Sequence, residues 1–205
     1  MTTELAFSPT PLLEIQLTQT DGTIARFAQD DPALVRQILD SLTPSKLFTV
    51  PHFVLGGDGA LSAFATARIE RVDLIAAQLP SWPYLGGATA VRELTEERFR
   101  AAYDPDQATA NRQEAGDKPG ITQVGYTELW TASGHRVFWE VEVESRLMMR
   151  ADFGPYLQSL FGAGGLHAQR EGVGVSILNP SALTRVVFHP GPPVLPFKAW
   201  PARRL

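Results

Sequence analysis

Histidine is a frequent metal ligand and acid–base catalyst, so the four histidines are the first residues to consider for chemistry. His52, His135, His167 and His189 are scattered along the 205 residues, and no pair has the spacing of a His-Glu-x-x-His zinc site. The chain has no cysteine, which excludes disulfides, thiolate nucleophiles and cysteine-bound metals. We therefore expect no metal, no cofactor and no catalytic residue that local patterns can identify.

Three glutamates, Glu140, Glu142 and Glu144, alternate along one segment. On a strand they share one face about 7 Å apart, a spacing at which like charges repel modestly and stay hydrated. A solvent-facing strand explains them better than the alternatives, a divalent-cation site or an acid–base pair. The glycine-rich stretches 56–59 and 162–165 are interpreted as a turn and a helix end, because neither has the strand-to-helix context of a phosphate loop.

Six residues remain as binding candidates: Arg71, Arg185, Trp82, Trp200, His167 and His189. An arginine in an apolar strand can reach a carboxylate through its planar fork, or it can lie outward with its stem over apolar surface. A tryptophan beside a proline can line a groove or cover a core. Both interpretations stay open for each pair.

Composition describes an ordinary globular chain, with 44% hydrophobic and 20% charged residues and a formal net charge of −4. The acidic balance argues against nucleic acid as the main partner. The first ten residues lack the pattern of a secretory signal, and no apolar run approaches the roughly 18 residues of a membrane span. We expect a soluble cytoplasmic protein that does not engage membranes.

Alternating apolar residues around an Asp-Gly turn predict a β-hairpin over residues 13–27. A helix is expected after Asp30 or Asp31, because Pro32 suits a first helical turn and apolar residues follow at helical spacing. Residues 47–55 and 61–75 are predicted to be extended.

Residues 86–120 are predicted to be a linker, with one helix over 95–103 and a polar loop over 104–120. The first pattern then returns as a second hairpin over 128–143 and a helix that Asp152 can cap.

Residues 61–74 align without a gap with residues 175–188, which places Ser62 on Ser176 and Arg71 on Arg185. Each copy continues to a Leu-Pro and closes on a Trp-Pro, at Trp82 and Trp200. The same order of features twice over favours duplication. We therefore predict an α+β fold, mainly antiparallel sheet, with two diverged copies of a β-hairpin–helix–β-hairpin unit packed about a pseudo-twofold axis. The units are expected over residues 1–85 and 121–205, the second with a proline-rich tail.

The function that this pattern favours is a non-enzymatic binding or assembly module, acting on a protein or peptide or on a second copy of itself. The alternative is an enzyme whose site is assembled from distant residues in the cleft between the units. For that site the polar residues to inspect are His167, His189, Asp152, Glu171 and Arg185.

Overall fold

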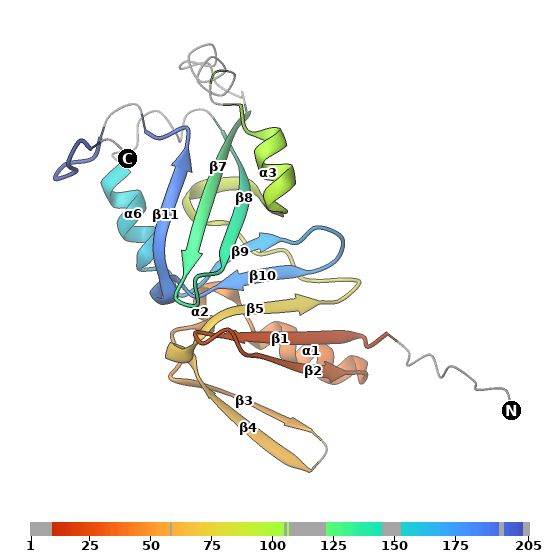
Figure 1. The fold of residues 1–205 in the computed structure, drawn as a ribbon. Helices are drawn as coiled ribbons and strands as arrows, with labels where there is room; N and C mark the ends of the chain where they lie inside the picture. Colours follow the sequence, from red (N-terminus) through yellow and green to blue (C-terminus); the bar gives the residue numbers. More distant parts are fainter. Residues whose placement is uncertain are drawn as a thin grey trace, which may run out of the picture.

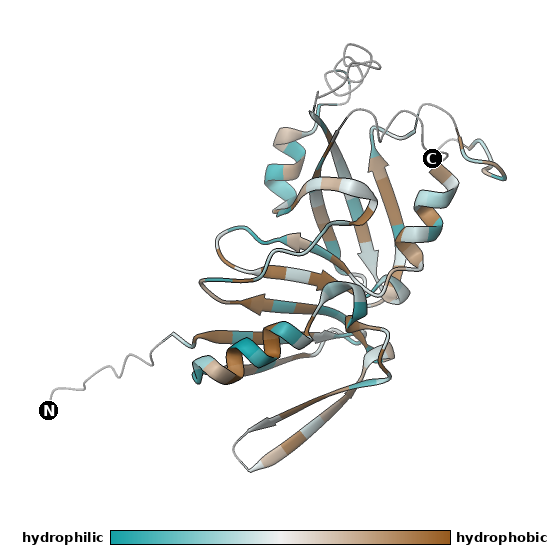
Figure 2. Ribbon diagram, turned by 180° about the vertical axis from the view of Figure 1, so that it is seen from behind, coloured by the Kyte–Doolittle hydropathy of each residue, from teal (hydrophilic) through white to brown (hydrophobic). Residues whose placement is uncertain are grey.

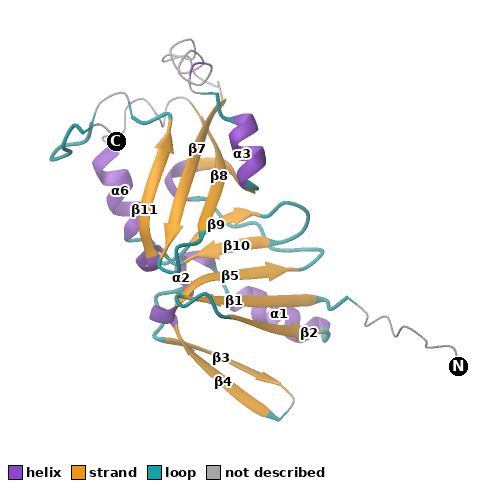
Figure 3. Cartoon of the chain, viewed as in Figure 1, coloured by secondary structure: helices purple, strands orange, loops and turns teal. Residues whose placement is uncertain are grey.

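The computed structural model describes residues 10–57, 59–104, 106, 122–144, 153–192 and 195–202, and it is a mixed α+β structure dominated by antiparallel sheet (Figure 3). The strands are β1 (Leu13–Gln19), β2 (Ile24–Gln29), β3 (His52–Gly57), β4 (Ala60–Ala65), β5 (Ile69–Ile75), β6 (Ala88–Leu94), β7 (Thr122–Thr131), β8 (Arg136–Glu144), β9 (Leu166–Gln169), β10 (Val175–Leu178) and β11 (Leu183–His189). The helices are α1 (Pro32–Ser41), α2 (Pro44–Leu47), α3 (Glu96–Ala102) and α6 (Phe153–Phe161), with 3₁₀ turns η1 (Thr66–Arg68), η2 (Leu85–Gly87) and η3 (Pro180–Ala182).

Nine strands form one sheet in the order β11-β7-β8-β6-β9-β10-β5-β1-β2 (Figure 1). Neighbouring strands are antiparallel except β6 and β9, whose parallel contact is the single pair Arg92 and Gln169. The predicted α+β class with mainly antiparallel pairing is thus confirmed. Strands β3 and β4 form a separate two-stranded hairpin.

Both predicted strand hairpins are present, and their turns are built alike. In β1–β2, Gln19 N–H donates to the Thr23 carbonyl at 2.8 Å, and Gly22 has φ of +85°. In β7–β8, Thr131 N–H donates to the His135 carbonyl at 3.0 Å, and Gly134 has φ of +84°. Glycine is required at these two positions because other residues rarely adopt positive φ.

Each half of the sheet has its own apolar core. Helix α1 begins where the Asp31 carboxylate accepts hydrogen bonds from Ala33 and Leu34 N–H, so Asp31 rather than Asp30 is the cap. Its Leu39 packs with the buried residues Leu13, Ile15, Leu17, Val72 and Leu74 of β1 and β5. A second cluster joins Leu160 of α6 to buried residues of β6 to β10. Figure 2 shows α1 lying across the rear of β1 and β2.

The predicted linker contributes more than a helix to the fold. Its helix is α3, whose Phe99 is buried against Tyr126 and Phe138. Residues 88–94, which carried no strand prediction, form β6 inside the main sheet. Residues 44–47, for which no helix was predicted, form α2, which overlaps the segment predicted to be extended only at Leu47. The polar loop beyond Asp106 and the predicted cap Asp152 lie outside the described residues.

The glycines after α6 do more than end a helix. A Cβ at Gly164 would lie 2.0 Å from the Ser45 carbonyl oxygen, and one at Gly165 would lie 2.3 Å from that of Pro44. Phe48 N–H also donates to the Gly164 carbonyl at 2.9 Å. The second half therefore packs its backbone directly on α2 of the first half. Among the described residues, no helix combines the length and apolar character needed to span a bilayer.

Candidate functional site

A buried ion cluster lies in the middle of the sheet. Arg71 on β5 donates from Nε to both carboxylate oxygens of Asp73, at 2.8 and 2.9 Å, and from Nη1 to Glu93 on β6 at 2.8 Å. Arg170, which follows β9, has Nε 3.9 Å from Asp73. Two buried polar atoms of the cluster, Glu93 Oε2 and Arg170 Nη1, have no partner among the described residues.

In this cluster, burial and the neighbouring charges shift the pKa values in opposite directions. Burial acts to lower the pKa of Arg71, but the nearby Asp73 and Glu93 carboxylates more than offset it and raise that pKa. Burial raises the pKa of Asp73, and Arg71 and Arg170 oppose this only in part. The raised pKa of Arg71 favours the charged pair, whereas the raised pKa of Asp73 favours its neutral carboxylic acid. Because Arg71 stays protonated and its Nε contacts both carboxylate oxygens closely, the charged pair is the state that the geometry fits.

A β-bulge in β5 joins the two halves. The pairing of β5 with β1 shifts beside Ile69 and Arg71, which leaves Glu70 out of register and only 1% exposed. The turn of β7–β8 covers it: Ser133 donates to the Glu70 carboxylate from Oγ at 2.7 Å and from its backbone N–H at 3.1 Å. Asn179 adds a second joint, because its Nδ2 donates to the carbonyls of Thr66 at 3.1 Å and Ile69 at 2.8 Å.

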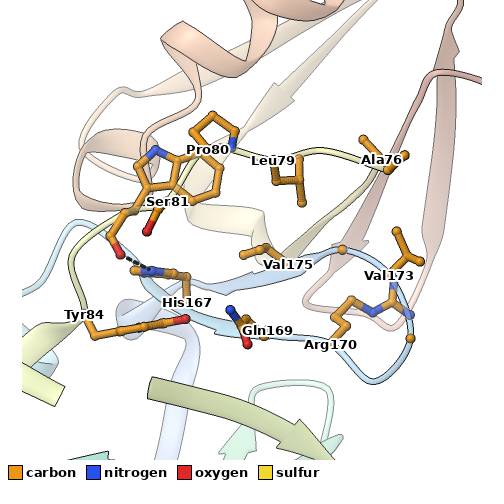
Figure 4. A pocket seen from close by; sticks show the side chains of 14 residues that line it. Ala76, Leu79, Pro80, Ser81, Tyr84, His167, Gln169, Arg170, Val173 and Val175 are labelled. Atoms are coloured by element: carbon orange, nitrogen blue, oxygen red, sulfur yellow. Dashed lines mark hydrogen bonds between the residues drawn. The ribbon is translucent and has the colours of Figure 1, made fainter. Parts of the chain in front are cut away.

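A hollow of about 330 Å³ lies where these halves meet, between residues 76–84 and residues 167–175 (Figure 4). His167 lies in its wall with the ring stacked on Tyr84, at 4.6 Å between centroids, and edge-on to Trp82. His167 Nε2 is 3.3 Å from the Trp82 carbonyl, which fits the neutral tautomer that donates from Nε2. Burial lowers the pKa of His167, and the contact with Trp82 opposes this weakly.

A second hollow, of about 530 Å³, lies beside the first and shares Arg170 with it. Glu93, Glu96, Arg136 and Glu171 are among its lining residues. The charged groups here are already paired across the surface: Arg98 with Glu171, and Arg136 with Glu96 at 2.7 Å. In the part of the chain that the structure describes, no three His, Asp or Glu side chains gather as metal ligands would.

The structure brings three of the six candidates from the sequence together and leaves three apart. Trp82 and His167 are in contact, and Arg71 reaches their hollow through Asp73 and Arg170. The other three have unrelated surroundings. The Arg185 guanidinium lies 4.6 Å from the centre of the Trp130 ring, His189 Nε2 is 3.0 Å from Glu128, and Trp200 is 89% exposed.

The residues inspected for an enzyme site are dispersed as well. His167, Glu171, Arg185 and His189 each have a different partner, and Asp152 lies outside the described residues. Of the acidic row, Glu140 and Glu142 both pair with Arg92 on the neighbouring strand β6. They form a surface ion network in which the positive charge of Arg92 is already engaged.

The sequence did not indicate that Asp73, Glu93, Tyr84 and Arg170 lie in the contact between the two halves. The alternation of Arg71 and Asp73 along an apolar strand was the available signal, because two opposite charges two residues apart share one face of a strand. Glu93 and Arg170 carry no comparable signal, since only the folded sheet brings β6 and the end of β9 within reach of the β5 side chains.

The most unusual surface of the molecule is the projecting hairpin, β3–β4, which stands apart from the main sheet (Figures 1 and 2). Within the described residues its two strands pair only with each other, from His52–Ala65 to Gly57–Ala60. One face is anchored on the first core, where Phe64 meets Phe27 edge-on at 5.8 Å. The outer face presents Val54 at 47% exposure and Leu61 at 74%.

Neither strand of the projecting hairpin contains an Asp, Glu, Lys, Arg or Pro. Natural proteins usually protect free strand edges with such residues, because unpaired backbone groups otherwise attract other strands. Comparison of this chain with protein-family models, with curated proteins and with solved structures gives no significant match.

Proposed function

We propose that this protein is a non-enzymatic binding and assembly module that recruits a protein strand through its projecting hairpin. The carrying observation is an anchored β-hairpin whose two outer edges are uncharged and have no strand paired to them among the described residues. Strand addition to a sheet edge uses main-chain hydrogen bonds for affinity and the alternating side chains for specificity.

The anchoring of the hairpin supports binding rather than disorder. Phe53, Leu55 and Phe64 pack against the first core, and Phe53 meets Phe48 edge-on at 6.1 Å. Thr66 Oγ1 and Thr66 N–H both donate to residues just before β3, the latter to the Pro51 carbonyl at 3.1 Å. A hairpin held at its base and on one face presents a preformed edge, which reduces the entropy lost on binding.

We include in this proposal that the chain contains an internal duplication. The order of hairpin, helix, second hairpin, 3₁₀ turn and strand occurs twice, as β1-β2-α1-α2-β3-β4-η1-β5 and as β7-β8-α6-β9-β10-η3-β11, with the short helix α2 as an addition in the first series. In both cases the last strand pairs with the first, with the same register between equivalent residues: Val72 opposite Leu17, and Val186 opposite Leu129. The pairing of each shifts at the equivalent place, beside Glu70 in β5 and beside Thr184 in β11.

The strand order favours a modified form of the pseudo-twofold relation expected from the sequence: the equivalent strands β5 and β11 run in opposite directions, as a half-turn requires, but the two units are also displaced along the sheet. A twofold axis perpendicular to the sheet would reverse the order of equivalent strands. The order β11-β7-β8 instead repeats as β5-β1-β2 in the same direction along the sheet. The arrangement therefore favours successive units in a row, a form that offers an unfilled position at each end.

The enzyme alternative has weaker support. Its hollow between the two halves contains a neutral histidine stacked on Tyr84 and an arginine already turned toward Asp73, and among the described residues no side chain hydrogen-bonds to His167. General acid–base catalysis needs such a group within hydrogen-bond reach of its partner.

Photo-crosslinking in the native cell tests the proposal. A benzoylphenylalanine placed at Val54 should capture a protein, because this outer-face position lies within the binding hairpin. The matched control is Leu34 on α1, which has nearly the same exposure, 45% against 47%, but lies on a helix with no free strand edge. Adducts from position 54 that do not exceed those from position 34 would refute the proposal.

A further inference from the structure

We infer that the strand recruited by the projecting hairpin is β11 of a second copy of this chain, with β4 of one copy antiparallel to β11 of the next. The inference rests on the proposed function and names its partner. Its basis is a pairing already present inside the chain, between β10 and β5, that the equivalent strands β4 and β11 have not made.

The internal pairing supplies the template. Strand β10 pairs with β5 through Val175–Leu74, Ser176–Asp73, Ile177–Val72 and Leu178–Arg71. All four residues of β10 are buried, because β9 and β5 flank the strand on both sides. The ungapped alignment makes β4 the equivalent of β10, and β11 the equivalent of β5. Both of these equivalents lack a neighbour on one side among the described residues.

The turns between these strands agree with the alignment. Thr66–Arg68 forms η1 between β4 and β5, and Pro180–Ala182 forms η3 between β10 and β11. These two segments correspond residue for residue in the sequence alignment of the strands. Within each repeat unit of the chain, the strands before and after the 3₁₀ turn are not paired with each other. Each repeat unit therefore has one strand, β4 or β10, that can pair with a strand outside its own unit.

The free backbone groups of β4 point in the required direction. In an antiparallel pair, consecutive residues alternate between facing the partner and facing away. Arg170 N–H donates to the Gly174 carbonyl, so alternation turns Val175 and Ile177 of β10 toward β5. Thr66 N–H donates to the Pro51 carbonyl, so the same alternation turns Leu61 and Ala63 of β4 toward the open edge.

Strand β11 offers the matching groups. The bond from Thr131 N–H to the His135 carbonyl sets the alternation of β7, which directs its even-numbered residues at β11. On β11 the backbone groups of Val186 and Phe188 then face away from β7, as those of Val72 and Leu74 face β10 in the template. The strand from Leu183 to His189 contains no Pro, Lys, Asp or Glu, and its one arginine is held over Trp130.

The template fixes the register between copies as Leu61 opposite Phe188, Ser62 opposite Val187, Ala63 opposite Val186 and Phe64 opposite Arg185. Leu61, which is 74% exposed, would then lie beside Phe188, itself packed on Phe153 and Tyr156 of α6. The pairing covers the most exposed large apolar side chain of the hairpin with an apolar neighbour. It also adds no buried unpaired charge.

The partner must be a second copy because one chain cannot make this pairing. Strand β11 ends the sheet on one side, whereas the projecting hairpin packs on Phe27 of β2, the strand that ends the sheet on the other side (Figure 1). Reciprocal exchange between two copies would close a dimer, and repeated addition would give a head-to-tail row. The contact is the same in either assembly: β4 of one copy pairs with β11 of another.

Complementation between two variants tests the inference. Ala63→Pro removes the outward N–H of β4, and Val186→Pro removes that of β11; proline is tolerated at edge positions whose N–H faces away from the sheet. Each variant alone should associate at least about tenfold more weakly than the natural chain, as expected for one lost hydrogen bond plus a steric block. An equimolar mixture should form a 1:1 heterodimer in sedimentation velocity, because one intact β4 and one intact β11 remain.

The mixture separates a lost contact from a misfolded variant, since an unfolded partner cannot restore association. A mixture that stays monomeric while the natural chain associates would overturn the inference, as would a natural chain that is monomeric up to about 1 mM. In that case, adducts of position 54 with another protein would leave the proposed function standing without the self-pairing.

A disulfide trap tests the register. The chain has no native cysteine, so Ser62→Cys with Val187→Cys introduces the only two thiols. These positions form a non-hydrogen-bonded pair, whose Cα separation of about 4.5 Å suits a disulfide. Oxidation should give dimers and larger species, whereas each single variant should give only slow background dimers. Equal yields from the double and single variants would overturn the register.

Discussion

The hairpins β3–β4 and β9–β10 both have short strands without Asp, Glu, Lys or Arg and hold similar places in the order of elements, but their surroundings differ. Hairpin β9–β10 is inserted in the sheet between β6 and β5, and all of β10 is buried. Hairpin β3–β4 projects beyond the sheet, and no residue of either strand is buried. The comparison teaches that sequence composition alone does not make such a hairpin part of a core, because a neighbouring strand must be available to cover it.

The strands that follow the hairpins show the same contrast. Strand β5 lies inside the sheet with Arg71 buried in an ion cluster, whereas β11 ends the sheet with Arg185 exposed. Arg71 and Arg185, which the sequence alignment matches, thus have different surroundings because their strands hold different positions in the sheet. Three measurements test this contrast between the two regions, and the first compares the arginines.

Replacing Arg71 should have the largest effect on stability. Arg71→Ala leaves Asp73 and Glu93 without their buried cation, and loss of one partner of a buried ion pair costs about 3–5 kcal/mol. Arg185→Ala, the matched control, loses an exposed contact with Trp130 worth about 0.5–1 kcal/mol. Urea denaturation of both variants measures the difference, and equal losses would contradict the distinct roles of β5 and β11.

The two hairpins should respond differently to truncation. Ile177→Ala on β10 removes a side chain with 0% exposure and should lower the free energy of unfolding by about 2–4 kcal/mol. Leu61→Ala on β4 should change it by less than about 0.5 kcal/mol in the monomer, because this side chain is largely hydrated. Thermal melts at low protein concentration make the comparison. A large loss from Leu61→Ala would mean that the projecting hairpin already has a covered outer face.

The smallest expected effect is a pH dependence carried by the inserted hairpin. Burial lowers the pKa of His167 below 6.5, so between the folded value and 6.5 the unfolded chain binds more protons. The stabilisation is complete above pH 6.5 and decreases as the pH falls toward the folded pKa, with a slope of at most about 1.4 kcal/mol per pH unit.

His167→Gln should remove this slope between pH 6.5 and 5, as measured by urea denaturation at a series of pH values. His52→Gln is the matched control, because His52 lies exposed on the projecting hairpin. A slope that persists in His167→Gln would place the titrating group elsewhere.

Much of the local structure was predictable from the residues. The hairpin of β1 and β2, helix α1 and helix α3 follow from alternation, an Asp-Gly turn, helical spacing and side-chain caps, all of which act within a few residues. Strand β6 was not predicted, because its alternation is broken and its partners β8 and β9 are far away in the sequence. The buried cluster escaped for the same reason, since Glu93 and Arg170 reach Arg71 and Asp73 only through the strand order.

The sequence by itself determined the turns, the helix starts, the absence of sulfur chemistry and the register in which residues 61–74 match residues 175–188. These depend on backbone preferences and side-chain types that are local to the chain. Only the tertiary structure decided that Arg71 is buried and Arg185 exposed, that Trp82 meets His167 while Trp200 is free in solvent, and that one hairpin is inserted while the other projects. The physical reason is that burial and strand pairing are properties of neighbours, and two matching segments of one chain do not have the same neighbours.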